Sequence, residues 1–306
     1  MERIHILHEN DAWSAPLFEA LQERGLPYEA WHLAEGRVAP AEAPPRGVFY
    51  NRMSASSHIR DHRFAPELTS STLAWLEAHE RRVLNGAEAM RLEISKLTQY
   101  AGLIAADVPV PQTIGAVGRK NVIAAARELG EFPFILKPNR GGAGAGVQRV
   151  DSLDMLVAIL DDPATPQPLD GTWLVQQWIA SPDATITRCE FIGGRFYYAV
   201  RVNTAEGFEL CPADACDTSD GREKFEIIAG FDDPLLPRLA AFLADAGIDV
   251  GAVELIRDGA GRAYAYDVNV NTNYNARAEA HAGVSGMGRV ADLLGEELAR
   301  VRAAAA

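Results

Sequence analysis

The spacing of apolar residues changes along the chain, and each change predicts a new element. Alternating apolar residues indicate strands, and apolar residues every three or four positions indicate helices. The chain opens as strand, helix, strand, and Gly25 ends that helix. The elements predicted at the start of the chain are strands at 3–9, 28–33, 47–51 and 81–85 and helices at 16–25 and 66–80. We therefore expect a small α/β layer structure over roughly the first 90 residues.

The rest of the chain divides where this pattern breaks. A helical pattern over 87–102 is followed by residues 108–113, in which two prolines enforce an extended linker that resembles a domain joint. The elements predicted around and beyond it are helices at 119–130, 152–162, 235–247 and 286–301, strands at 134–136, 147–150 and 173–179, and hairpins at 187–202 and 251–275. The domains expected from this division are residues 1–95, 96–178 and 179–306.

The composition bounds the class of protein. The chain has 306 residues, of which 48% are apolar, and this is ample for a buried core. Its 29 basic and 42 acidic residues give a net charge of −13, which argues against a nucleic-acid partner or a membrane surface. The first residues lack the apolar stretch of a signal peptide, and no apolar run approaches about 18 residues, so we expect a cytoplasmic protein.

Three cysteines, Cys189, Cys211 and Cys216, are too few for a four-thiolate zinc site and odd in number. Free thiols are therefore expected. Cys211 and Cys216 lie either near a substrate or among buried bystander residues, and the sequence leaves both interpretations open.

A strand that ends in a lysine and a glycine-rich loop indicates an anion site. Residues 134–136 form a short apolar run before Lys137. Glycines then leave the backbone N–H groups open to an anion, and they are Gly141, Gly142, Gly144 and Gly146. Val147 and Gln148 exclude a P-loop, and the glycine spacing excludes a dinucleotide fingerprint. An ordinary glycine-rich hairpin is the alternative.

The hairpin at 251–275 predicts a metal site. From Ala263 the sequence alternates, which places Asp267, Asn269 and Asn271 on one face and Tyr264, Tyr266, Val268 and Val270 on the other. A turn near Gly259 brings Glu254 opposite or diagonal to Asp267. Ligand sets of oxygen alone favour a hard cation, so we expect Mg²⁺, with Mn²⁺ as a substitute. The alternative is a solvated hairpin face.

A polar segment follows the strand at 47–51, where open α/β sheets commonly bind ligands. It carries Arg52 and Arg60, and Arg277 lies just beyond the acidic hairpin. These arginines could converge on one cleft and hold a substrate carboxylate, because the guanidinium fork matches that group. A solvated loop with surface ion pairs is the alternative.

Together these segments resemble the ATP-grasp superfamily, and within it the carboxylate–amine ligases of the RimK and glutathione-synthetase type. The resemblance covers nearly the whole chain. It implies an α/β fold in which an N-terminal α/β domain precedes two α+β subdomains that hold ATP between them. Three departures from the family pattern are Gln177 in place of Glu, Ile186 in place of Asp, and residues 271–274 in place of a Ser-Pro-Gly type ending.

The resemblance also implies roles for individual residues. Lys96 and Lys137 match the two lysines that contact the nucleotide, and Gly141 to Gly146 match the loop over the phosphates. Arg201 matches the arginine near the transferring phosphate and, with Lys137, is expected to be catalytic. The residues that match the adenine-contacting hinge are Gln176, Gln177, Trp178 and Ile179, those that match the magnesium ligands are Glu254, Asp267 and Asn269, and those expected to contact substrate are Arg52, Arg188, Asn271 and Arg277.

The implied activity is formation of an amide or peptide bond, driven by ATP, through an acyl phosphate. The expected partners are small carboxylate and amine substrates, with amino acids or small peptides as the favoured class, and a homo-oligomer is compatible with the sequence. Two alternatives stay open, a phosphotransferase of the same fold and a non-catalytic nucleotide-binding module.

Overall fold

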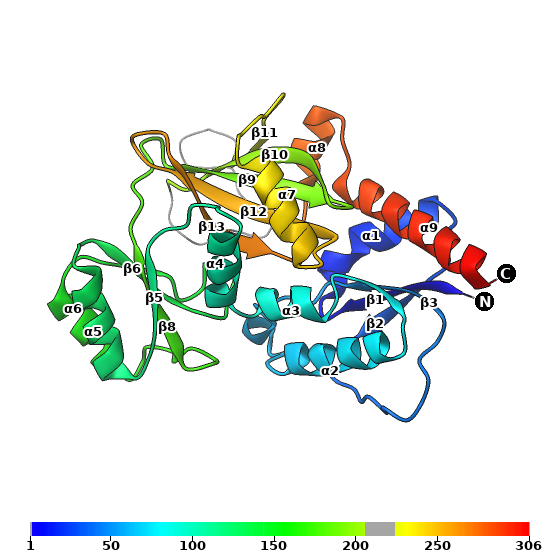
Figure 1. Ribbon diagram of the computed structural model, residues 1–306, viewed down its shortest axis with the longest axis horizontal. Coiled ribbons are helices and arrows are strands. Elements are labelled where there is room, and N and C mark those ends of the chain that lie inside the picture. The colour runs from blue at the N-terminus through cyan, green and yellow to red at the C-terminus, as the bar shows by residue number, and fades with distance from the viewer. Residues whose placement is uncertain (1, 143, 206–223, 306) are drawn as a thin grey trace.

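The computed structural model describes residues 2–142, 144–205 and 224–305. Cys211 and Cys216 lie outside these residues, and Cys189 is a buried free thiol. The described residues form three sheets, each from a different part of the sequence (Figure 1). The chain is therefore an α/β protein.

The first sheet is parallel, with strand order β2-β1-β3-β4. Its elements are β1 (Arg3–His8), α1 (Asp11–Glu23), β2 (Tyr28–His32), β3 (Gly47–Asn51), the short helix η1 (Ser57–Arg60), α2 (Ala65–Ala78) and β4 (Arg82–Leu84). All four strands agree with the prediction. Helix α1 begins at Asp11, five residues before the predicted start at Pro16. The Asn10 side chain accepts from the Trp13 N–H and so caps the helix at this earlier position.

The second sheet is antiparallel, with order β5-β8-β6-β7. Its elements are β5 (Thr113–Val117), α5 (Arg119–Leu129), β6 (Phe134–Pro138), β7 (Gln148–Val150), α6 (Leu153–Asp161) and β8 (Thr172–Gln177). Strands β6 and β7 enclose the glycine-rich loop, as predicted. Strand β5 was not predicted, because its five residues follow two prolines and include Gly115.

The third sheet is antiparallel, with order β11-β10-β9-β12-β13. Its elements are β9 (Thr185–Ile192), β10 (Arg195–Asn203), β11 (Phe225–Ile227), α7 (Leu236–Asp245), β12 (Val250–Arg257) and β13 (Ala263–Asn269), and α8 (Ala276–Ala282) and α9 (Gly286–Ala305) follow. The short elements β11 and α8 were not predicted. Helix α9 packs against α1 and β3, so one hydrophobic core joins the first and third sheets.

The helix predicted over 87–102 is wrong as a single element. The structure has α3 (Ala87–Glu93) and α4 (Lys96–Ala105) instead. Ser95 separates them, because its hydroxyl accepts from the Thr98 N–H and caps the new helix. Lys96 is thus the first residue of α4, and its own N–H donates to the Asn139 carbonyl at the end of β6, 3.2 Å away.

The predicted alternation on β13 is also wrong at one point. The register between β12 and β13 shifts after the Glu254–Asp267 pair, so Tyr266 is an extra residue, a β-bulge. Ala265 on one side of the bulge and Val268 on the other both point into the core. Tyr266 therefore faces the same side as Asp267 and Asn269, not the side of Val268.

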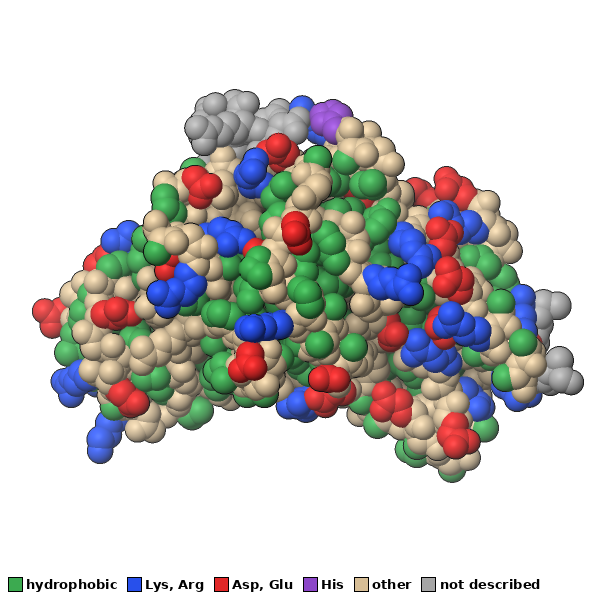
Figure 2. All heavy atoms as spheres, turned by 45° about the horizontal axis from the view of Figure 1, so that its top comes forward, with side chains coloured by type: hydrophobic (Ala, Val, Ile, Leu, Met, Phe, Trp, Pro, Cys, Tyr) green, Lys and Arg blue, Asp and Glu red, His purple; other side chains and the backbone are tan. Residues whose placement is uncertain are grey.

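Basic and acidic side chains are interspersed over the face in Figure 2. Within the part of the chain that the structure describes, no helix combines the length and the apolar character needed to cross a bilayer.

Candidate active site

Strands β12 and β13 bring two carboxylates together. Glu254 and Asp267 are cross-strand partners, as the hairpin pattern predicted. Glu254 is 3% exposed. Its carboxylate accepts from the Tyr266 hydroxyl at 2.5 Å and from Asn269 Nδ2 at 3.3 Å. Burial raises the pKa of Glu254, and the neighbouring charge of Asp267 raises it further.

This cluster has the chemistry of a hard-cation site. Its oxygen atoms come from Glu254, Asp267 and Asn269, and neither His nor Cys contributes. The raised pKa of Glu254 reflects burial and the nearby charge of Asp267, and a divalent cation would favour the ionised carboxylate there. The residues present therefore fit Mg²⁺ or Mn²⁺.

The two predicted lysines approach this cluster from other elements. Lys96 at the start of α4 forms an ion pair with Asp267. Burial disfavours the charged ammonium of Lys96, but the charge of Asp267 outweighs this effect and raises the pKa of Lys96 above its usual range. Lys137 on β6 is 5% exposed and donates to the Tyr100 hydroxyl at 2.8 Å. Burial and the charge of Lys96 lower the pKa of Lys137 to about 7.

The glycine-rich loop lies against the segment that follows β3. A Cβ atom on Gly142 would come within 3.2 Å of the Ser56 Cβ, so the loop packs closely against the Ser56 side chain. Gly144 and Gly146 have φ near +75°, which L side chains rarely adopt. Gly141 has ordinary space around it. Arg140 at the start of the loop pairs with Glu67 on α2, 2.6 Å away.

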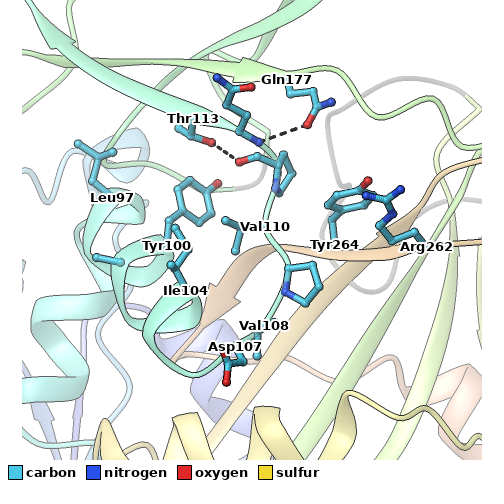
Figure 3. A pocket seen from close by; sticks show the side chains of 14 residues that line it. Leu97, Tyr100, Ile104, Asp107, Val108, Val110, Thr113, Gln177, Arg262 and Tyr264 are labelled. Atoms are coloured by element: carbon cyan, nitrogen blue, oxygen red, sulfur yellow. Dashed lines mark hydrogen bonds between the residues drawn. The ribbon is translucent and has the colours of Figure 1, made fainter. Parts of the chain in front are cut away.

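A cavity of about 760 Å³ lies between α4, the linker to β5 and the turn of the β12–β13 hairpin (Figure 3). Apolar side chains line much of it, including Leu97, Ile104 and Val110. Of the predicted nucleotide-contacting residues, Gln177 lines this cavity. Tyr100 also lines it while its hydroxyl accepts from Lys137, so this ring joins the cavity to the charged cluster.

The other residues of the predicted hinge lie beside the cavity. Gln176 is buried, and its Nε2 donates to the Thr113 hydroxyl at 2.8 Å. Trp178 carries the Arg149 guanidinium over its ring, 5.4 Å from the centroid. Ile179 is buried.

The two predicted arginines of the β9–β10 hairpin lie in different settings. Arg188 faces Glu254 across the sheet and forms an ion pair with Glu190 at 2.7 Å. Arg201 is 47% exposed and pairs with Glu226 on β11, also at 2.7 Å. The structure therefore brings Arg188 to the carboxylates, while Arg201 lies on the half-exposed part of the same sheet.

The arginines expected at the substrate differ in the same way. Arg52 is 2% exposed and donates to the Trp13 carbonyl at 3.1 Å and to Asn273 Oδ1 at 3.0 Å, which ties the first sheet to the end of β13. Arg60 pairs with Glu9. Arg277 is exposed on α8, and Asn271 is half-buried just after β13.

Several residues of this region were missed by the sequence reasoning. Glu190 is 2% exposed and accepts from the Thr272 hydroxyl at 2.9 Å. Glu93 accepts from the N–H groups of Ala55 and Val270, and burial raises its pKa to about 7. The polar alternation of Arg188 and Glu190 within an apolar strand was a usable signal for the first. Glu93 lies on a helix with no such signal.

Comparison with known proteins identifies the fold. No protein-family model matches the chain. D-alanine–D-alanine ligase of Ectopseudomonas mendocina (strain ymp) is 34% identical over 102 residues, 33% of this chain and 31% of the relative. Alpha-aminoadipate–LysW ligase LysX of Saccharolobus solfataricus is 28% identical over 132 residues, 40% of this chain and 47% of the relative. The matched stretches thus span less than half the length of these relatives.

Solved structures match over nearly the whole chain. The RimK domain ATP-grasp protein of Sphaerobacter thermophilus DSM 20745 aligns with a TM-score of 0.69 and 22% identity, over 95% of this chain and 98% of that one. D-cycloserine synthetase DcsG aligns with a TM-score of 0.68 and 21% identity, over 96% and 99%. The chain therefore has the fold of these ATP-grasp proteins.

Proposed function

We propose that this protein is an ATP-dependent carboxylate–amine ligase that forms an amide or peptide bond and releases ADP and phosphate. The observation that carries the proposal is the meeting of a set of oxygen donors with two lysines, one of which lies on the strand that leads into the glycine-rich loop. The relatives support it, since D-alanine–D-alanine ligase and alpha-aminoadipate–LysW ligase LysX are both named as ligases.

The reaction requires little covalent chemistry from the protein. A substrate carboxylate oxygen attacks the γ-phosphorus of ATP, the bond to the β–γ bridging oxygen breaks, and ADP leaves. An amine nitrogen then attacks the acyl carbon of the acyl phosphate, and inorganic phosphate leaves as the nitrogen loses a proton. Phosphoryl transfer is accelerated mainly by positioning and by neutralising charge.

The residues divide this work. Glu254, Asp267 and Asn269 would hold Mg²⁺ or Mn²⁺, which when bound neutralises phosphate charge. Lys96 and Lys137 would neutralise phosphate oxygens from the other side, and the loop from Gly141 to Gly146 would cover the phosphates and exclude water. Water must be excluded because an acyl phosphate hydrolyses. Gln176, Gln177, Trp178 and Ile179 would contact adenine.

Amino acids or small peptides are the proposed substrates. Arg52 and Arg277 would hold a substrate carboxylate, with Arg188 and Asn271 nearby. Since Arg277 is exposed, Arg277→Ala should leave the fold intact, raise the KM for a carboxylate substrate several-fold and leave that for ATP nearly unchanged. Arg52→Ala should do the same to KM but also lower the melting temperature, because Arg52 is buried. If neither KM changes, the carboxylate pocket lies elsewhere.

Release of ADP tests the activity directly. The purified protein is given Mg²⁺, ATP and a panel of amino acids and dipeptides, each with and without a second amine. A ligase releases ADP and phosphate in amounts equal to the amide formed. A phosphotransferase yields a stable phosphorylated acceptor without an amine, and a binding module releases no ADP; either result would refute the proposal.

A further inference from the structure

A second cluster of potential metal ligands lies in the first sheet, away from the carboxylates of the third. His8 and His32 are partners at the last positions of the adjacent parallel strands β1 and β2, so both side chains emerge on one face. Asp11 is the first residue of α1, which follows β1 directly (Figure 1). One ligand atom from each of these three residues lies within 4.8 Å of the others.

The state of His8 points to a missing partner. His8 is 1% exposed, and neither of its ring nitrogens has a hydrogen-bond partner among the described residues. Buried imidazole nitrogens are normally satisfied, because leaving one unpaired costs free energy. The Nδ1 atom is 3.8 Å from Asp11 Oδ1, too far for a hydrogen bond. Asp11 and the ring of His32, whose centroid lies 5.3 Å from that of the His8 ring, are therefore its neighbours within the cluster.

The neighbouring polar residues Glu9, Arg60 and His62 are engaged with one another. His62 has its ring 5.8 Å from that of His32, but its Nδ1 already contacts Glu9 at 2.8 Å. Glu9 also pairs with Arg60, whose guanidinium lies over the Trp13 ring, 4.3 Å from its centroid. That group is neutralised internally and leaves His8, Asp11 and His32 as a separate set.

We propose that His8, Asp11 and His32 bind a transition-metal dication of the zinc type. Two imidazoles and one carboxylate suit Zn²⁺ and its neighbours in the first transition row, whereas Mg²⁺ prefers oxygen alone. Zn²⁺ bonds such ligands at about 2.0–2.2 Å, so ligand atoms around it lie roughly 3.3 Å apart. The Asp11 side chain, 84% exposed, can rotate to close the difference from the observed spacing.

Such an ion would join three elements that otherwise meet only through packing and the strand ladder. It would fix the start of α1 against the ends of β1 and β2, and water would complete its coordination. Trp13, two residues further along α1, accepts from Arg52 through its carbonyl. The metal would therefore also hold the helix turn that supports Arg52. This site does not depend on the ligase activity.

The test uses Zn²⁺ alone with the whole protein. The protein is freed of metal and saturated with Mg²⁺ and ADP, so that hard-cation sites are filled, and Zn²⁺ affinity is measured by competition with a chromogenic chelator. We expect one equivalent to bind and to raise the melting temperature. His32→Ala and Asp11→Asn, both at exposed positions, should each weaken binding at least about tenfold, since even outer partners of metal ligands contribute that much.

A matched control and a spectrum make the result decisive. His281→Ala removes an exposed histidine on α8 and should bind Zn²⁺ like the wild type. Co²⁺ bound in the same place should give visible bands without the near-ultraviolet thiolate band that Cys ligands produce. The proposal is overturned if the wild type binds no Zn²⁺, if both ligand variants bind it normally while folding normally, or if the thiolate band appears.

Discussion

The second and third sheets both contribute charged side chains to the candidate site, but these side chains have different kinds of neighbour. On the third sheet each acid has a cation beside it, Glu190 with Arg188 and Asp267 with Lys96. On the second sheet Lys137 instead meets tyrosines, the hydroxyl of Tyr100 at 2.8 Å and the ring of Tyr266 at 5.8 Å.

The acids of the third sheet therefore have ion-pair partners within the protein, whereas Lys137 has none at ion-pair distance among the described residues. Burial raises the pKa of Glu190, while the neighbouring charge of Arg188 opposes that rise and favours the ionised carboxylate. Lys137 has a pKa lowered to about 7, and only a nearby anion would restore its charge fully. We infer that a phosphate group would be that anion.

Removing an ion-paired acid of the third sheet should have the largest effect on turnover. Asp267→Asn removes one carboxylate of the proposed metal set and the partner of Lys96. We expect turnover at limiting Mg²⁺ to fall by about 10²- to 10³-fold, the scale seen when a charge-stabilising group is lost. ADP release measured against Mg²⁺ concentration checks this.

A surface acid of the same sheet provides the control for Asp267. Glu226 is 57% exposed and pairs with Arg201. Glu226→Gln should leave the Mg²⁺ dependence as in the wild type. Wild-type turnover of Asp267→Asn at limiting Mg²⁺ would refute the metal assignment.

Removing the charge of Lys137 should weaken nucleotide binding without lowering the free energy of unfolding. Lys137→Met keeps the apolar stem in its buried place and deletes the charge. We expect affinity for MgATP to fall by about 100-fold, while the free energy of unfolding at pH 7 stays level or rises, since a buried amine is costly. Lys120→Met, at an exposed position on α5, is the control.

The same variant has a pH signature. The folded-state pKa of Lys137, about 7, lies below the value of roughly 10.4 in an unfolded chain. Between about pH 7 and pH 10 the unfolded chain therefore binds a proton that the folded chain does not, so this group makes the free energy of unfolding rise with pH. Lys137→Met should lose that slope, up to about 1.4 kcal/mol per pH unit. Identical slopes in denaturant titrations would contradict the lowered pKa.

The sequence predicted one side of this comparison better than the other. The Glu254–Asp267 pair was predictable because a turn near Gly259 sets the register of the hairpin. The pairing of Lys96 with Asp267 was not, because those residues are 171 positions apart and their distance depends on how α4 packs on β13. The Tyr100 hydroxyl, which accepts from Lys137, was missed for the same reason.

Local breaks were the other source of error. Ser95 splits a helical pattern that continues in apolar spacing on both sides, and only its side-chain cap reveals the break. The bulge at Tyr266 moves a tyrosine to the site face, although the alternation gives no sign of it. The position of a bulge depends on packing on both faces of the sheet, and the sequence of one strand does not reveal that packing.

That bulge can itself be tested. Tyr266→Phe removes the hydroxyl that donates to Glu254 and keeps the ring near Lys137. We expect Mg²⁺ affinity to fall by 10- to 100-fold, the usual cost of losing a partner that orients a metal ligand. Tyr264→Phe is the control, because that hydroxyl donates to Asp258 at the hairpin turn. Equal Mg²⁺ titrations for the two variants would show that Tyr266 orients nothing.

The smallest expected effect concerns Arg201, which belongs to the third sheet but lies on its half-exposed part. A surface ion pair contributes about 0–1 kcal/mol, so losing the pair with Glu226 should barely change the melting temperature. If Arg201 contacts the transferring phosphate, Arg201→Ala should lower kcat by about tenfold while the KM for ATP changes little, because the contact strengthens in the transition state. Glu226→Gln breaks the same pair from the other side and should leave kcat unchanged. Equal kcat values for both variants and the wild type would assign Arg201 to the surface and leave Arg188, already beside Glu254, as the arginine of the site.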